Sequence, residues 1–217
     1  MSSYYPVFLD LKKRRCVIIG GGSEAEKKVP YLLKCEAIIT VISSKTTHKI
    51  KDWINQGAVS WKARDFSQGD LSEVFLAIDT SDEPSINQVV VREAAEERVL
   101  LNVVDVTPLC TFIAPAIVNR GDVTVAISTS GTSPALARKL RESLESSDIL
   151  DYANLSQFLS KARKTVKELA MSVNPDQWQK YINETLLSLV ANGHEQEAIE
   201  YLLNGLSEGT PPIEVNK

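Results

Sequence analysis

Short apolar runs alternate with helix-length segments over residues 1–112, and few folds accommodate this order. The runs are rich in Val and Ile and mostly apolar on both sides, as in strands that helices cover on both faces. They span residues 16–19, 38–42, 59–62, 74–78 and 100–104, and the helix-length segments between them span 23–36, 45–56 and 83–98. This β-α-β-α order predicts an α/β domain with a parallel, doubly wound sheet. In the last helical segment Ile86, Val89, Val90 and Ala94 recur at helical spacing and predict its buried face.

The pattern changes after Asp105. Residues 112–128 predict two strands joined by a tight turn at Asn119–Asp122, with no helix between them. A helix is expected next, because Thr132 or Ser133 can cap it and Pro134 suits its first turn.

From about Asp151 onward the periodicity is helical, with breaks expected at Asn174–Pro175 and Asn192–Gly193. The chain is therefore expected to have three parts. They are the α/β domain at 1–112, a segment of hairpin and helix at 113–147, and an all-helical domain at 148–217.

Composition excludes several classes of protein. Lys and Arg total 24 against 28 Asp and Glu, so the net charge of −4 argues against nucleic acid as the main partner. No apolar stretch exceeds strand length, which argues against a membrane span, and the first 15 residues do not form a secretion signal. Three cysteines without metal-ligand spacing suggest reduced thiols in a cytoplasmic protein, and two histidines exclude a three-histidine metal centre, so no metal site is predicted.

The strongest local signal follows the first apolar run, where Gly20, Gly21 and Gly22 precede Ser23 and Ala25. Gly20, Gly22 and Ala25 fit the G-x-G-x-x-G/A pattern of Rossmann-type domains. In that pattern the first glycine permits a tight turn, the second lets backbone approach a pyrophosphate, and the small third residue lets helix and strand pack closely. The segment lies between a strand and a helix, as the motif requires, so dinucleotide binding is favoured over a merely structural turn.

One part of the dinucleotide pattern is missing. An acidic residue at the end of the second strand normally binds the adenosine ribose, but this strand ends in Ser43, Ser44 and Lys45. Serine hydroxyls can bind ribose and Lys45 would tolerate a 2′-phosphate, so the motif does not decide between NAD and NADP.

Two further positions are candidates for chemistry. Asp105 ends the fifth apolar run, where a carboxylate could face a bound nicotinamide and act as a general base. Alternatively, it could simply cap the following turn or pair with a surface lysine. The hydroxyl-rich segment 128–134 opens a helix that carries Arg138, and it could form an anion site or be only a well-capped helix with a solvated basic face.

Longer segments resemble the precorrin-2 dehydrogenase family of siroheme synthesis. They are residues 5–11 (YPVFLDL), VIIGGGSEAEKK, LAIDTSDEPSIN and, most specific of all, residues 102–142, beginning NVVDVTPLC and including the Gly-Thr-Ser-Pro of 131–134. The resemblance covers nearly the whole chain. Three residues depart from the family pattern. Glu24 stands where a small apolar residue is usual, Asp79 where a small residue is common, and Thr129 in the place of a serine that is phosphorylated in one branch of the family.

The resemblance implies an NAD-dependent oxidation of the tetrapyrrole precorrin-2 to sirohydrochlorin by a homodimer whose segment 113–147 makes the dimer contact. Some members of the family also insert iron(II). Asp105 matches the essential aspartate. The expected cofactor contacts are Gly20, Gly21, Gly22, Ser23, Glu24, Ser43, Ser44, Lys45, Thr80, Ser81 and Val104. The expected substrate contacts are Asn102, Arg120, Ser130, Gly131, Thr132, Ser133 and Arg138.

Two alternatives stay open. One is a non-enzymatic, NAD-responsive sensor on the same fold, and the other is a dehydrogenase for another tetrapyrrole or a small acid. Asp105 and the Gly-Thr-Ser-Pro segment favour an enzyme, because a sensor needs no base beside the nicotinamide.

Overall fold

The computed structural model of the chain describes residues 4–207. It divides into two compact units. The first contains the described residues up to Ala114 together with Ser130–Thr132, and the second contains Pro115–Thr129 and the described residues from Ser133 onward. The three-part division expected from the sequence stays a prediction, and residues 208–217 of its helical domain lie outside the described residues.

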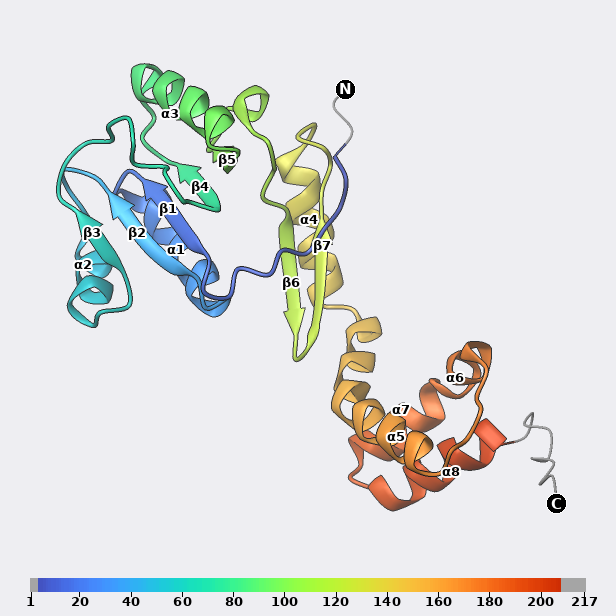
Figure 1. Ribbon diagram of the computed structural model, residues 1–217. Helices are drawn as coiled ribbons and strands as arrows, with labels where there is room; N and C mark the ends of the chain where they lie inside the picture. Colours follow the sequence, from blue (N-terminus) through green and yellow to red (C-terminus); the bar gives the residue numbers. More distant parts are fainter. Residues whose placement is uncertain (1–3, 208–217) are drawn as a thin grey trace. The chain divides into compact units, whose positions relative to one another are not determined.

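A five-stranded parallel sheet forms the centre of the first unit (Figure 1). Its strands are β1 (Arg15–Ile19), β2 (Ile38–Ile42), β3 (Ser60–Lys62), β4 (Leu76–Asp79) and β5 (Leu100–Val103), in the order β3-β2-β1-β4-β5. The connecting helices are α1 (Ser23–Lys34), α2 (His48–Asn55) and α3 (Pro84–Glu96). This arrangement confirms the predicted α/β fold, because all sheet pairs are parallel and the strand order reverses direction at β1.

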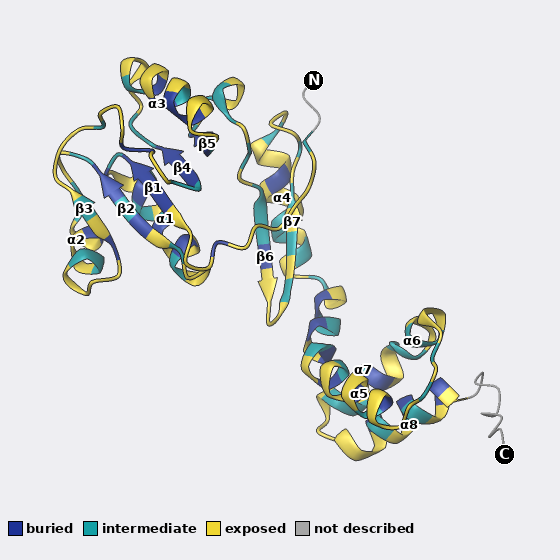
Figure 2. Ribbon diagram, in the orientation of Figure 1, coloured by how far each residue is buried: buried dark blue, intermediate teal, exposed yellow. Residues whose placement is uncertain are grey.

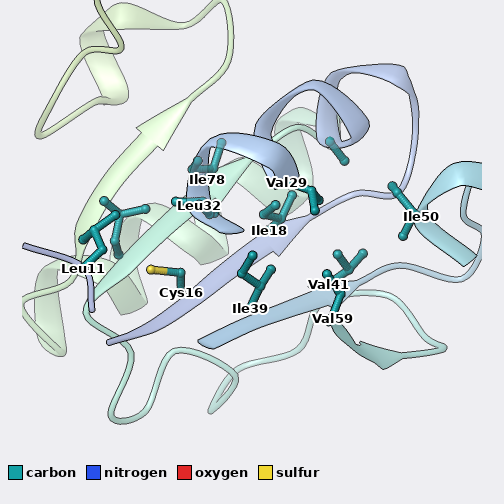
Figure 3. Close-up of a cluster of buried hydrophobic side chains, with 12 residues drawn as sticks. Leu11, Cys16, Ile18, Val29, Leu32, Ile39, Val41, Ile50, Val59 and Ile78 are labelled. Carbon is teal, nitrogen blue, oxygen red and sulfur yellow. The ribbon is translucent and has the colours of Figure 1, made fainter. Parts of the chain in front are cut away.

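The two faces of the sheet carry separate apolar clusters because side chains alternate along each strand. On one face Cys16 and Ile18 of β1 pack with Ile39 and Val41 of β2 and with Val29 of α1 (Figure 3). On the opposite face Val17 and Ile19 of β1 pack with β5 and with α3. Figure 2 shows how the buried residues concentrate in the central strands.

The predicted buried face of α3 needs one correction. Val90 and Ala94 are buried, but Val89 is 39% exposed. Asn87 and Glu93 are buried in its place, because each makes hydrogen bonds with the loops beside the sheet. A helix face that anchors polar loops cannot be recognised from apolar spacing alone.

The second unit begins with the predicted hairpin, β6 (Ala116–Arg120) and β7 (Val123–Ile127), which forms a two-stranded antiparallel sheet. It packs against α4 (Pro134–Glu145). Ser133 caps α4, since its side chain accepts a hydrogen bond from the Leu136 N–H. The predicted turn and helix start are confirmed.

The rest of the second unit is helical. The 3-10 helix η2 (Asp148–Leu155) leads into α5 (Ser156–Glu168), α6 (Pro175–Tyr181), α7 (Glu184–Ala191) and α8 (Glu195–Ser207), which surround their own apolar core. Asn174 and Asn192 lie at helix boundaries as predicted, and Asn183 caps α7 at a further break that the sequence analysis missed. Within residues 4–207 no helix is both long and apolar enough to cross a membrane.

Candidate functional site

A cavity of about 440 Å³ lies at the carboxyl ends of β1, β2 and β4 in the first unit. Ligands bind at this edge of open α/β sheets, where the strand order reverses. Eight of the predicted cofactor contacts line it: Gly20, Gly21, Gly22, Ser43, Ser44, Lys45, Thr80 and Ser81. Its other lining residues were not predicted as contacts: Ile19, Ile42, Thr46, Thr47, Asp65, Phe66, Glu83 and Ile86.

The first two glycines of the turn lie against neighbouring loops. Gly20 has a φ of +96°, and a Cβ there would come within 2.5 Å of Thr80 Oγ1. A Cβ on Gly21 would lie 2.1 Å from the Lys45 carbonyl oxygen. Both positions therefore need glycine so that the turn can pack against the ends of β2 and β4.

Gly22 lies in different surroundings. A Cβ built on it meets no atom within 4 Å, and the residue lines the cavity. It is the N-cap of α1 and offers no side-chain cap to the first helical turn, while Ala25 is fully buried beneath that turn. The uncapped N–H groups and the helix dipole suit an anion at this position.

Ser23 and Glu24 begin α1 and do not line the cavity. The Glu24 carboxylate accepts a hydrogen bond from Lys27 Nζ at 2.5 Å, and this bond lowers the pKa of Glu24. The family departure at Glu24 therefore leaves a carboxylate that is paired on the surface of the helix. Glu24 and Ser23 stay predictions as cofactor contacts.

The end of β2 forms a tight polar turn. Ser43 Oγ donates to the Lys45 carbonyl at 2.7 Å and accepts from the Lys45 N–H at 3.3 Å, whereas Ser44 and Lys45 are exposed. Next to them Thr46 Oγ1 is buried and has no hydrogen-bond partner within the described part of the chain. Ser44 and Lys45 are the members of this turn best placed to meet a ligand.

Asp79, the second family departure, is buried at the end of β4. Burial raises its pKa, although its Oδ1 accepts a hydrogen bond from the Ser81 N–H at 3.0 Å. The Asn87 amide, oriented to satisfy its neighbours, donates to Asp79 Oδ2 at 2.9 Å. Asp79 therefore fixes the loop that carries Ser81 and does not line the cavity.

Asp105 lies in the turn directly after β5 and is exposed. Its φ of +61° places it in the left-handed region, which Asp tolerates better than most residues. Within residues 4–207 its carboxylate makes no hydrogen bond or ion pair, so the alternative interpretation as a cap or a surface ion pair has no support. Val104 before it is half-buried, and its N–H donates to the Asp79 carbonyl.

Asn102 is buried in β5, and its contact with substrate stays a prediction. Its Nδ2 donates to the Phe112 carbonyl at 3.1 Å and approaches Cys110 Sγ at 3.5 Å. These bonds hold the loop after Asp105 against the sheet.

The remaining predicted substrate contacts belong to both units. Ser130, Gly131 and Thr132 belong to the first, and Ser130 and Gly131 have φ values of +54° and +81°. Arg120, Ser133 and Arg138 belong to the second unit, whereas Asp105 belongs to the first.

In the second unit Arg120 is exposed at the end of β6. Arg138 Nε donates to Glu142 Oε1 at 2.8 Å on the exposed side of α4. Within the described residues no group of three or more His, Cys, Asp or Glu side chains could hold a metal ion.

The residues around the cavity fit a dinucleotide. Gly22 leaves open space before an uncapped helix, as a pyrophosphate requires. Phe66 and Ile86 form apolar parts of the cavity wall, while Ser44 and Asp65 contribute polar groups at its surface.

Comparison with known families agrees with this site. A family model described as "Putative NAD(P)-binding" matches residues 7–116, which is half of the chain. The chain belongs to this family. A second model, described as "Sirohaem biosynthesis protein central", matches residues 120–147 and so covers the hairpin and α4.

Curated relatives match over nearly the whole chain. Siroheme synthase 1 of Serratia proteamaculans is 36% identical over 215 residues, covering 95% of this chain and 45% of its own length. The siroheme synthase of Photobacterium profundum is 37% identical over 213 residues, covering 96% of this chain and 45% of its own. The chain therefore spans a little under half the length of these relatives. The predicted resemblance to siroheme-synthesis proteins is confirmed.

A solved structure, "SirC, precorrin-2 dehydrogenase", has a TM-score of 0.75 to this chain at 24% identity. The match covers 93% of this chain and all of the other. It confirms the predicted fold, including the hairpin and the helical part.

Proposed function

We propose that this protein oxidises precorrin-2 to sirohydrochlorin with NAD⁺ as the hydride acceptor. The observation that carries the proposal is the open cavity at Gly22 in a domain of the NAD(P)-binding family. The siroheme synthases matched over 95% of the chain support the pathway, and the fold shared with a precorrin-2 dehydrogenase supports the reaction.

The reaction removes a hydride and a proton from the macrocycle. Bound NAD⁺ supplies the hydride acceptor, and the proton needs a base. Asp105 is our candidate for this base. Its carboxylate is exposed at the carboxyl edge of the sheet and makes no hydrogen bond or ion pair within residues 4–207. A general base of this kind contributes typically about 10²–10⁴-fold to the rate.

Recognition of a polycarboxylate substrate needs cations and hydrogen-bond donors. We propose that the Gly131–Ser133 segment and Arg138 supply them, with Arg120 as a further cation. Ser133 is the N-cap of α4, where the helix dipole favours negative charge. Arg138→Ala should raise the KM for precorrin-2 more than that for NAD⁺, whereas equal effects on both would indicate a structural role.

We also propose a cytoplasmic homodimer, in keeping with the three free cysteines and with the open edges of the hairpin. Iron(II) insertion into sirohydrochlorin would be a second reaction, with the metal ion as a substrate.

One assay tests the proposal. Purified protein is incubated with precorrin-2 and NAD⁺ while NADH and the tetrapyrrole spectrum are followed, and iron(II) is then added. We expect NADH to form together with sirohydrochlorin, and siroheme to appear after iron only if the chain also chelates. Tight NAD⁺ binding without any oxidation of precorrin-2 would favour a sensor or a dehydrogenase for another substrate.

A further inference from the structure

β2 does not end in the acidic residue that normally binds the adenosine ribose, but the loop after β3 carries a candidate for this role. Asp65 lies on the loop between β3 and β4 and lines the same cavity as Ser44 and Lys45. We propose that Asp65 accepts hydrogen bonds from the adenosine ribose hydroxyls of the bound dinucleotide and thereby makes the protein prefer NAD⁺ to NADP⁺. This inference rests on the proposed function and adds the residue that selects its cofactor.

The strand register brings Asp65 to the end of β2. β2 and β3 are parallel neighbours, with Ile42 paired to Lys62. Lys45 lies three residues after Ile42, and Asp65 lies three residues after Lys62. Both residues therefore lie just beyond their strands at the same edge of the sheet. The loop after β3 can therefore supply the carboxylate that the loop after β2 does not carry.

Buried side chains fix the backbone around Asp65. Asp70 is only 6% exposed and accepts two hydrogen bonds from Arg64, at 2.6 and 2.7 Å, and one from Lys62 at 2.7 Å. Arg64 Nη1 also donates to the Asp65 carbonyl at 3.0 Å. Glu93 of α3 holds the far end of the loop by accepting from the Gly69 and Leu71 N–H groups, at 3.0 and 2.7 Å.

The Asp65 side chain is left available by this network. It is exposed, and within the described residues its carboxylate makes no hydrogen bond or ion pair. The adjacent cations, Lys62 and Arg64, are both bonded to Asp70. A fixed backbone with an unengaged carboxylate at a cavity wall is the arrangement that a ribose diol requires, because the diol offers two donors to one acidic group.

The same carboxylate would repel a 2′-phosphate. Lys45 acts in the opposite sense, since its cation lines the same cavity and attracts that phosphate. Lys45 and Asp65 are both exposed, so water weakens both charges. The ribose hydroxyls donate hydrogen bonds to Asp65 in addition, and a hydrogen bond to a charged group is worth roughly tenfold to a hundredfold in binding, so we assign Asp65 the larger effect.

Calorimetric titration of the whole chain with NAD⁺ and with NADP⁺ tests this assignment without any turnover. We expect the wild type to bind NAD⁺ more tightly. Asp65→Asn should weaken NAD⁺ by roughly tenfold or more while NADP⁺ binding stays equal or improves. Lys45→Gln should shift the preference further toward NAD⁺. Asp52→Asn, which changes an exposed carboxylate on α2 away from the cavity, should alter neither affinity.

An Asp65→Asn variant with the wild-type melting temperature and an unchanged ratio of the two affinities would overturn the assignment. A wild type that binds neither dinucleotide would overturn both this inference and the proposed function. A wild type that binds NAD⁺ but leaves precorrin-2 unchanged would overturn only the proposed function, because the ratio still tests Asp65.

Discussion

Gly21 and Gly22 are adjacent residues whose surroundings differ sharply. A methyl group on Gly21 would overlap the Lys45 backbone carbonyl, whereas one on Gly22 would enter open space. We predict that Gly21→Ala destabilises the protein by about 1–3 kcal/mol, the usual cost of overpacking, because backbone must move to admit the methyl group. Gly22→Ala should melt close to the wild type. Thermal unfolding of both variants checks this, and equal melting temperatures would contradict it.

A substitution at Gly22 also tests where the cofactor binds. A bulky side chain there would occupy the space before the uncapped end of α1, where we expect the pyrophosphate. Gly22→Val should therefore raise the Kd for NAD⁺ strongly while the fold is kept. Unchanged NAD⁺ affinity in a folded variant would remove the glycine turn from the site.

Asp105 is the residue on which the proposed chemistry depends. Asp105→Asn keeps the size of the side chain and tolerates the left-handed backbone, but it cannot accept a proton. We expect a loss of precorrin-2 oxidation by about 10²–10⁴-fold with unchanged NAD⁺ affinity. Asp82→Asn is a control for the backbone conformation, since Asp82 is also an aspartate in the left-handed region, with a φ of +57°. Near wild-type turnover by Asp105→Asn would exclude the residue from the mechanism.

At the scale of structural elements, a buried charge on Asp70 holds the loop between β3 and β4. Burial disfavours ionisation of Asp70, but hydrogen bonds from Arg64, Lys62 and the Ser67 N–H outweigh burial and hold its pKa below the ordinary value of 3.8. The charge of Asp70 thus adds stability that is complete above that value and is lost as the pH falls below it toward the depressed pKa.

Asp70→Asn removes this contribution. We expect the variant to lose about 2 kcal/mol of unfolding free energy at pH 7. Hydrogen bonds to charged groups contribute about 1.5–3 kcal/mol, and we expect a value in the lower half of that range because Arg64 and Lys62 are half-exposed. The difference from wild type should shrink as the pH is lowered below 3.8. Chemical denaturation at pH 7 and in the acid range measures it, and a difference independent of pH would contradict the assignment. NAD⁺ affinity should fall as well, since the loop carries Asp65.

The elements themselves were largely predictable from the sequence, because strand-length apolar runs and capping residues act locally. β2 and the hairpin turn lie where the pattern placed them, and Ser133 caps α4 as expected. The loop carrying Asp65 was missed because its place at the cavity depends on the pairing of β3 with β2. The partners of the Asn102 amide were missed as well, because Cys110 and Phe112 lie on a loop whose path cannot be predicted from the local sequence.

For the whole molecule, the second unit carries apolar surface that assembly would cover. Leu136 and Leu140 of α4 are 50% and 46% exposed, and the hairpin beside α4 has only two strands in its sheet. Open strand edges and exposed leucines on the same unit favour pairing with a second copy, and a two-fold dimer would cover both at once. We therefore predict that the wild type is a dimer at micromolar concentration.

A double variant tests the surface that the dimer uses. Leu136→Glu with Leu140→Glu places two carboxylates where the partner would pack, so light scattering should report a folded monomer. Leu169→Glu is the matched control, because Leu169 is 57% exposed at the end of α5 and should leave the dimer intact. A wild type that scatters as a stable monomer would contradict the dimer. A double variant that stays dimeric would place the contact elsewhere on the molecule.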